Sequence, residues 1–82
     1  MNHVKILLFA TLREKAGVRQ LKLDVEESTS LSGLKTLLAA QFPALKGSLA
    51  HCLAAIDHEY QLEDTLIPTG AEVALFPPVS GG

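Results

Sequence analysis

The residues that could do chemistry gather at the C-terminal end, in the run FPPVSGG at 76–82. Pro77 and Pro78 are expected to keep this segment extended and pointing away from a folded body. Gly81 and Gly82 lack Cβ atoms, so the pair fits a narrow channel that would exclude any larger residue. A frayed end is the ordinary interpretation of terminal glycines. The prolines before them favour a tail shaped for insertion into a partner.

Catalysis by side chains finds little support. The sequence has no glycine-rich phosphate loop, no HExxH motif and no convincing Ser/His/Asp set. His51 beside Cys52 resembles a base next to a nucleophile, but both are predicted on a strand, where neighbours point to opposite faces. Cys52 is therefore interpreted as a buried structural residue.

The other histidines and the acids are predicted to be solvated. His3 and His58 have no nearby ligand partners in the sequence and are expected at the surface. Four acids in one stretch are more typical of a solvated loop than of a metal site: Asp57, Glu59, Glu63 and Asp64. A single cysteine excludes an internal disulfide and any four-cysteine zinc or iron-sulfur site. We expect no bound metal.

Composition restricts the class of protein. A chain of 82 residues, 48% hydrophobic and 20% charged, supports one domain with a packed core. A net charge of -2 lacks the basic excess that nucleic acid or an anionic lipid surface requires. The longest apolar run, Ile6–Ala10, is far below the roughly 20 residues of a membrane span, and no secretion signal is visible. We therefore expect a cytoplasmic protein with neither nucleic-acid nor membrane partners.

The first half of the chain predicts two strands. The nearly continuous apolar run Val4–Thr11 indicates a strand buried on both faces and central in a sheet. Leu12–Val18 carries charges and Gly17, so it is interpreted as a connection. Gln20–Val25 alternates strictly between apolar and polar residues, which predicts a half-exposed strand.

One long helix of about three turns is predicted next. Ser30 is well placed to cap its start, and Pro43 ends it, because the residue before a proline avoids helical dihedrals. Apolar residues recur between them at helical spacing: Leu31, Leu34, Leu37 and Leu38.

The second half predicts two further strands. Cys52–Asp57 is short and apolar, with helix as the competing interpretation, and Glu72–Phe76 reads as the last strand. Tyr60–Leu66 between them is mixed and polar. Pro68–Gly70 is typical of a turn with glycine at positive φ.

This order of elements predicts an α+β fold. A single main helix must cover one face of a mixed sheet, and a buried first strand pairs naturally with the last strand in parallel. That is the β-grasp arrangement of ubiquitin-like domains. We expect residues 1–78 to form this domain and residues 79–82 to form a flexible Gly-Gly tail.

The sequence resembles a known family, the small subunits of molybdopterin synthase, which are sulfur carriers in molybdenum cofactor biosynthesis. The resemblance rests on KILLFATLREKAG (5–17), the helix end LLAAQ, LAAIDHE (53–59) and GAEVALFPPVSGG (70–82). The last is the most specific, because thiamine-pathway carriers share the final Gly-Gly but typically lack FPPV. Asp57 stands where the family usually has asparagine and Ser80 where threonine is common, so a local turn at Asp57 is expected to differ.

The resemblance implies chemistry at the terminal carboxylate. That group is ionised at neutral pH and is a poor electrophile, so it must be activated first. In the family, a ubiquitin-activating-like enzyme uses ATP to form an acyl-adenylate at the terminal glycine, here Gly82. Sulfur from a donor such as a cysteine desulfurase then displaces AMP and leaves a thiocarboxylate. The chain itself is expected to bind no cofactor.

The resemblance also implies a complex. The loaded tail would enter the active site of a large subunit and give its sulfur to cyclic pyranopterin monophosphate, two rounds building the dithiolene of molybdopterin. The implied assembly is a heterotetramer with two copies of each subunit. The catalytic residues belong to the partners, so this chain is a sulfur-donor subunit of a transferase complex.

Partner contact is expected along the tail and on an adjoining surface. The three aromatic residues in the expected set fit half-buried core positions and partner contacts equally well from their types alone, and the resemblance favours contact. Arg13 is either a solvated charge or the partner of an acidic group. The expected contacts are Phe9, Arg13, Tyr60, Phe76, Pro77, Pro78, Val79 and Ser80.

Two other functions stay open at this point. One is a carrier of the thiamine pathway or a protein-modifying ubiquitin-like protein, and the other is a non-catalytic interaction module with an inert tail.

Overall fold

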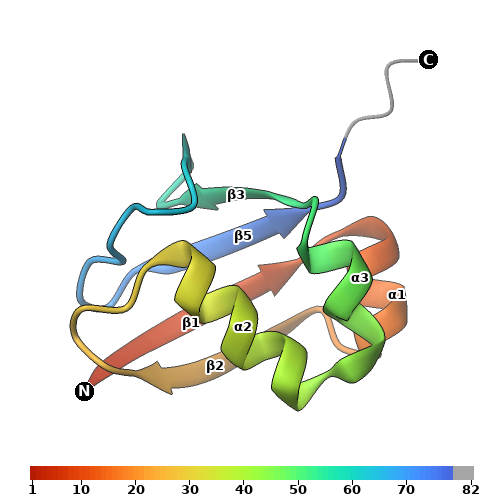
Figure 1. Cartoon of the computed structure of the whole chain (residues 1–82), viewed down its shortest axis with the longest axis horizontal. Coiled ribbons are helices and arrows are strands. Elements are labelled where there is room, and N and C mark those ends of the chain that lie inside the picture. The colour runs from red at the N-terminus through yellow and green to blue at the C-terminus, as the bar shows by residue number, and fades with distance from the viewer. Residues whose placement is uncertain (79–82) are drawn as a thin grey trace.

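A five-stranded mixed sheet organises residues 1–78, the part of the chain that the computed structural model describes (Figure 1). Its strands are β1 (Asn2–Leu8), β2 (Gln20–Val25), β3 (Leu53–Ile56), β4 (Glu59–Gln61) and β5 (Glu72–Phe76). They lie in the order β2-β1-β5-β3-β4, with β1 and β5 parallel and the other pairs antiparallel. The predicted β-grasp arrangement, with its parallel first and last strands, is confirmed.

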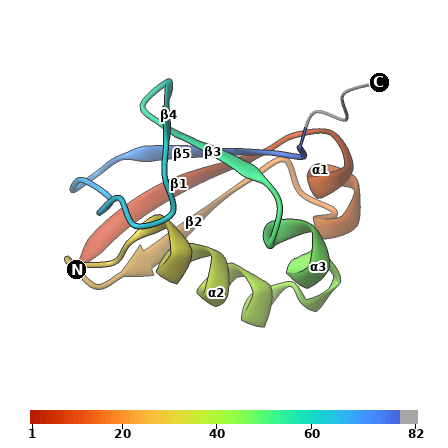
Figure 2. The ribbon, with the colours of Figure 1, turned by 45° about the horizontal axis from the view of Figure 1, so that its top comes forward.

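Helices cover one face of this sheet (Figure 2). The longest is α2 (Leu31–Gln41), followed by η1 (Pro43–Leu45) and α3 (Lys46–Leu49), while α1 (Ala10–Ala16) lies at the end where β1 finishes. The Ser30 hydroxyl accepts a hydrogen bond from the Gly33 backbone N–H at 3.2 Å, which satisfies one of the free donors at the start of α2. The predicted cap, and the end of the helix before Pro43, are confirmed.

The core lies between α2 and one face of the strands. Burial alternates along β1 and β5, so that every second side chain is withdrawn from solvent. Full burial of an aliphatic side chain contributes about 1.5–3 kcal/mol. The largest fully buried apolar side chains are Val4, Ile6, Leu8, Leu12, Val25, Leu31, Leu34, Leu38, Leu45, Val73 and Leu75. The opposite face of the sheet stays open in the described part of the chain.

The first strand ends earlier than the sequence indicates. The prediction of a strand over Val4–Thr11 buried on both faces was wrong, because β1 ends at Leu8 and its residues Lys5 and Leu7 are only half-buried. Ala10, with φ of 52°, instead begins α1. The apolar run is continuous because it combines two elements. Alternate residues of β1 face the core, and the apolar residues after Leu8 belong to the start of α1.

Helix α1 occupies the segment that was interpreted as a connection. Its single fully buried residue is Leu12. Gly17 closes the helix in the left-handed region at φ of 78°, donating its N–H to the Arg13 carbonyl at 2.9 Å, as glycine commonly does at this position. Because only one of its seven residues is fully buried, the sequence shows no helical periodicity over this segment.

Helix α2 buries three of the four leucines that recur at helical spacing, together with one lysine. Leu37 is 44% exposed, whereas Lys35 is buried. The Lys35 ammonium donates to the Cys52 carbonyl at 3.1 Å and pairs with Glu63. Glu63 is exposed in a loop, as predicted, and the ion pair with Lys35 is a contact that the sequence did not indicate. A lysine can take such a position because its long alkyl stem packs like an aliphatic chain.

The short strand β4 was not predicted. It begins at Glu59 and overlaps the start of the segment Tyr60–Leu66, which was described only as mixed and polar. Asp57 and His58 have φ of 48° and 73° and join β3 to β4 in a two-residue turn, as hairpins with positive φ at both central positions do. The Asp57 carboxylate accepts from the Glu72 N–H at 3.0 Å, and the Asp57 N–H donates to the Glu72 carbonyl at 2.9 Å. These bonds fix the turn against β5.

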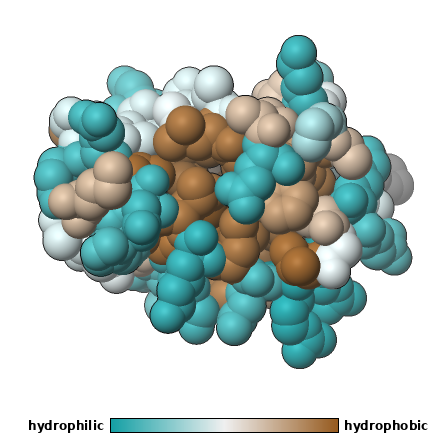
Figure 3. Space-filling model, turned by 90° about the horizontal axis from the view of Figure 1, so that it is seen from below, coloured by the Kyte–Doolittle hydropathy of each residue, from teal (hydrophilic) through white to brown (hydrophobic). Residues whose placement is uncertain are grey.

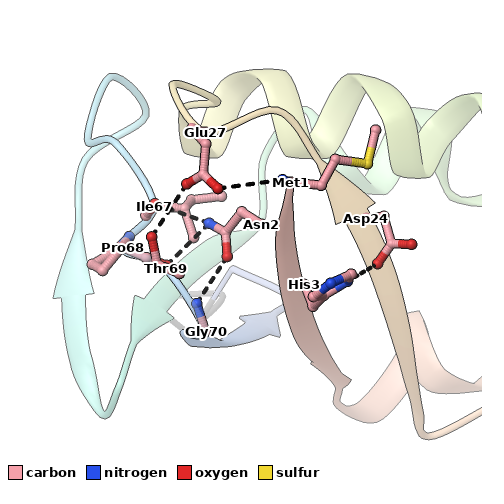
Figure 4. A network of polar contacts seen from close by, with 9 residues as sticks. All are labelled: Met1, Asn2, His3, Asp24, Glu27, Ile67, Pro68, Thr69 and Gly70. Atoms are coloured by element: carbon pink, nitrogen blue, oxygen red, sulfur yellow. Dashed lines mark hydrogen bonds and ion pairs between the residues drawn. The ribbon is translucent and has the colours of Figure 1, made fainter.

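A buried asparagine ties the start of β1 to the turn before β5 (Figure 4). The Asn2 side chain is fully buried and donates to the carbonyls of Ile67 at 3.2 Å and Pro68 at 3.1 Å. Its carbonyl oxygen accepts from the Gly70 N–H at 2.8 Å. Gly70 has φ of 72°, so the predicted turn at Pro68–Gly70 is confirmed.

Replacing this asparagine should destabilise the fold. Asn2→Ala leaves the buried Ile67 carbonyl without a partner and removes the bonds to the Gly70 N–H and to the Pro68 carbonyl, which keeps the Ala71 N–H. An unsatisfied buried group costs about 1–3 kcal/mol. We expect the free energy of unfolding to fall by about 2–4 kcal/mol in urea titrations. Thr69→Val is the control, because it removes only the exposed hydrogen bond to Glu27. Equal losses in the two variants would contradict the role given to Asn2.

Candidate functional site

The open face of the sheet is apolar at one end. Residues paired across neighbouring strands share a face, and the register joins Leu7 to Ala74, Leu53 to Phe76, and Ala55 to both Ala74 and Tyr60. Phe9 follows β1 at this end, and its N–H donates to the Leu75 carbonyl at 3.2 Å. We call this group the aromatic surface: Leu7, Phe9, Leu53, Ala55, Tyr60, Ala74 and Phe76.

Three aromatic rings form the centre of this surface. The rings of Phe9 and Phe76 are stacked, with centroids 4.6 Å apart and planes at 12°, and Tyr60 lies 6.1 Å from Phe76 at 54°. Tyr60 is 69% exposed and Phe9 39% exposed. The structure therefore brings together the three predicted aromatic residues, lining a shallow hollow of about 220 Å³. Their contact with a partner stays a prediction.

The other end of the open face is charged. Lys5 lies 3.8 Å from the Glu72 carboxylate across the β1–β5 pair, and His3 pairs with Asp24 across β1 and β2. The charged end therefore borders the aromatic surface on one side. A polar border around an apolar centre is the usual composition of a protein interface.

The tail follows directly from the aromatic surface. Phe76 is the last residue of β5, Pro77 is half-buried and Pro78 is exposed. Val79, Ser80, Gly81 and Gly82 lie outside the described residues, and the roles predicted for them stay predictions. Any partner that receives this segment must approach the end of β5.

The remaining candidates lie elsewhere. Arg13 is exposed on α1 and is not among the residues that line the hollow. Cys52 is buried, and His51 is exposed. Both precede β3, so the argument from opposite strand faces was wrong, although the burial of Cys52 was predicted correctly. Within residues 1–78, no group of three or more His, Cys, Asp or Glu side chains could hold a metal ion.

The environment of Cys52 makes its sulfur unreactive. Its Sγ lies 3.5 Å from the Leu49 carbonyl, and burial raises the pKa of the thiol against the opposing charge of Lys35. A raised pKa lowers the thiolate fraction at any pH below it, and the thiolate is the nucleophile. Cys52 is therefore poorly suited to accept or pass on sulfur.

Four residues of the aromatic surface were missed from the sequence: Leu7, Leu53, Ala55 and Ala74. Alternation within β1 and β5 marks Leu7 and Ala74 as lying on the open face, but only once the strand bounds are known. Leu53 joins Phe76 through the β3–β5 register, which no local pattern encodes.

Membership of a family follows from the comparison of residues 6–82, which match the model described as the ThiS family. The chain belongs to the ThiS family. A relative named molybdopterin synthase sulfur carrier subunit, from Dictyostelium discoideum, is 36% identical over 99% of this chain and 98% of its own. For residues 1–78, no helix is long and apolar enough to cross a membrane.

Solved structures place this ThiS-family chain among β-grasp proteins. The crystal structure of SAMP1 from Haloferax volcanii superposes with a TM-score of 0.87 at 30% identity, covering 99% of this chain and 100% of that one. A subunit of molybdopterin-converting factor from Helicobacter pylori, solved as a complex of subunits 1 and 2, has a TM-score of 0.68 at 22% identity, covering 98% and 99%. At that identity the second likeness shows the fold alone.

The burial of Cys52 predicts slow alkylation. At neutral pH, iodoacetamide should modify the folded protein at least about tenfold more slowly than the protein in urea, because the folded thiol is covered and more fully protonated. The rate for the folded protein should rise with pH as the thiolate forms. Intact mass against time measures both rates. Equal rates in the folded and unfolded states would contradict the inertness of Cys52.

Proposed function

We propose that this chain is the sulfur carrier subunit of molybdopterin synthase and that it acts through the carboxyl group of Gly82. The observation that carries the proposal is the position of the aromatic surface at the end of β5, immediately before the FPPVSGG tail. A chain that docks through this surface presents its tail at the same place. The similarity to a named sulfur carrier subunit along nearly the whole of both chains supports it.

If the chain docks through the aromatic surface, the number of residues after Phe76 determines how far the tail can extend into the partner. Aromatic residues are the side chains that most often dominate binding energy at protein interfaces. Six residues follow Phe76, and an extended chain spans at most about 3.3–3.6 Å per residue, so the carboxyl group can reach about 20 Å into a partner. The proposed partner is the large subunit, with two copies of each subunit in a heterotetramer. The Helicobacter pylori structure is a precedent for a complex between the two kinds of subunit.

The proposed chemistry proceeds in three steps, which we place in the cytoplasm. A ubiquitin-activating-like enzyme joins the Gly82 carboxylate to AMP from ATP, because an ionised carboxylate has no adequate leaving group. Sulfur from a donor such as a cysteine desulfurase displaces AMP and forms the thiocarboxylate. In the large subunit that sulfur passes to cyclic pyranopterin monophosphate, and the carboxylate is regenerated. The side chains of this chain dock and position the tail, while the partners supply acids, bases and ATP.

A second candidate is a protein modifier, which the similarity to SAMP1 favours. In that function the activated carboxyl group would form an isopeptide bond with a lysine of another protein. The two candidates differ in their product. Incubation with activating enzyme, ATP and sulfide gives a mass gain of one oxygen replaced by sulfur in a carrier, and protein conjugates in a modifier.

The length of the tail is the sharpest test of the proposal. Deleting Gly82, or adding one residue after it, should abolish molybdopterin formation. One residue moves the reacting carbon by about 3.3–3.6 Å, whereas attack requires contact at about 3–3.5 Å. Reconstitution with activating enzyme, sulfide source, large subunit and cyclic pyranopterin monophosphate measures this activity. The melting temperature should stay within about 1 °C as the control for folding. Appreciable turnover by either variant would refute the role of Gly82.

The aromatic surface is tested by two neighbouring substitutions in β5. Phe76→Ala should weaken binding to the large subunit about 30-fold, or about 2 kcal/mol, while destabilising the fold only moderately. Leu75→Ala is the matched control, because Leu75 is fully buried on the opposite face and its loss should cost about 2–5 kcal/mol of folding stability. Calorimetry and urea unfolding separate the two effects. Unchanged affinity in Phe76→Ala would remove the aromatic surface from the interface.

A further inference from the structure

Strand β2 leaves one edge of the sheet unpaired. Among the described residues it pairs with β1 alone, and it lies at the border of the sheet (Figure 1). The Leu8 N–H donates to the Arg19 carbonyl at 2.9 Å, and closely bonded pairs recur at every second residue of an antiparallel ladder. Leu21 and Leu23 therefore direct their backbone groups towards β1. The even-numbered residues of β2 direct theirs outwards.

An apolar strip runs beside this free edge. Leu21 and Leu23 are half-buried and pack against the core, as do Ala39 of α2 and Phe42 at its end. Seen from below, hydrophobic residues gather in the middle of this face, with hydrophilic side chains around them (Figure 3). A free strand edge beside apolar surface is a template for pairing with another strand.

The charges on β2 contain an unfavourable pair. Lys22 lies directly opposite Lys5 of β1, and like charges in that position are destabilising. Lys5 has Glu72 at 3.8 Å, whereas Lys22 has no ion pair within residues 1–78. Asp24 follows two positions later on the same face, where it pairs with His3. The edge thus alternates a positive and a negative side chain around Leu23.

We propose that β2 pairs antiparallel with β2 of a second copy of this chain, about a two-fold axis at Leu23. This register sets Lys22 of each copy opposite Asp24 of the other, and the axis makes the contact occur twice. The second copy's Asp24 then offsets the repulsion between Lys22 and Lys5. On the helix side of the sheet, Leu23 meets its own counterpart and Leu21 meets Val25, which extends the apolar strip across the junction.

Other registers fail on backbone or charge. A shift by one residue would set Lys22, whose backbone N–H and C=O point outwards, opposite an odd-numbered β2 residue of the second copy. The backbone groups of that residue already bond to its own β1, so no ladder of hydrogen bonds could form. A two-fold axis at Lys22 opposes two lysines, and an axis at Asp24 opposes two aspartates. An axis at Asp24 would also set Lys22 opposite Glu26, which lies beyond the end of β2. Among these three axes, only the one at Leu23 pairs opposite charges within the strand. The aromatic surface extends over β1, β5, β3 and β4 and includes no residue of β2, so this pairing leaves it accessible and does not depend on the proposed function.

Charge exchange tests the pairing. Sedimentation velocity from about 10 µM to about 1 mM should show a monomer–dimer equilibrium for the wild-type chain. Lys22→Glu and Asp24→Lys should each weaken dimerisation about tenfold or more, because each turns both contacts repulsive. An equimolar mixture of the two variants should dimerise again, since the glutamate introduced in one chain then meets the lysine introduced in the other. Lys22→Glu places a carboxylate opposite Lys5, so its folding should not suffer. Lys15→Glu carries the same charge change on α1 and should dimerise as the wild type does.

A crosslink tests the register. In the proposed pair the two Leu23 residues face each other in a non-hydrogen-bonded position, with Cα atoms about 4.5 Å apart, within the range of a disulfide. In a Cys52→Ser background, oxidised Leu23→Cys should form a covalent dimer, and Leu21→Cys, which would face Val25, should not. A chain that stays monomeric at about 1 mM, dimerisation unaffected by Lys22→Glu, or equal crosslinking through positions 21 and 23 would each overturn the proposal.

Discussion

The parallel pairing of β1 with β5 is the interaction on which the rest of the structure depends. It aligns Leu8 with Leu75 and so brings Phe9, the next residue, beside Phe76. The same alignment sets one face of both strands against α2 and leaves the other open. Because β1 lies near one end of the described chain and β5 near the other, the core closes and the aromatic surface forms in a single arrangement.

Sequence patterns predict those strands and helices whose apolar residues all face a single buried surface. In β2 and α2, alternation, the Ser30 cap and the proline after the helix all agree, and the observed bounds match. Where one apolar run contains the end of a strand and the start of a helix, as VKILLFAT does, the apolar pattern overestimates the length of the strand. Helix α1 and strand β4 are too short to show a period. The burial of Lys35 depends on Glu63 and the Cys52 carbonyl, which only the tertiary structure brings near.

The candidate site also has one part that local sequence patterns predict and one part that depends on strand register. Gly-Gly after a diproline is a local signal, and it points to the chemistry of the terminus without any structure. The aromatic surface is assembled by register across four strands, so residue types identify its rings but not the aliphatic residues between them. Leu53 illustrates this limit, because the sequence places it in a strand and only the pairing with Phe76 places it on the aromatic surface.

The bonds between Asn2 and the turn at Gly70 have a consequence for synthesis on the ribosome. The bonded groups are 65 to 68 positions apart, so the asparagine waits for almost the whole described chain before it is satisfied. Contacts of such long sequence separation form late and slow folding. A nascent chain therefore carries the apolar strand β1 without its partner until residues 72–76 have been translated, and the unpaired strand is prone to aggregate during that interval.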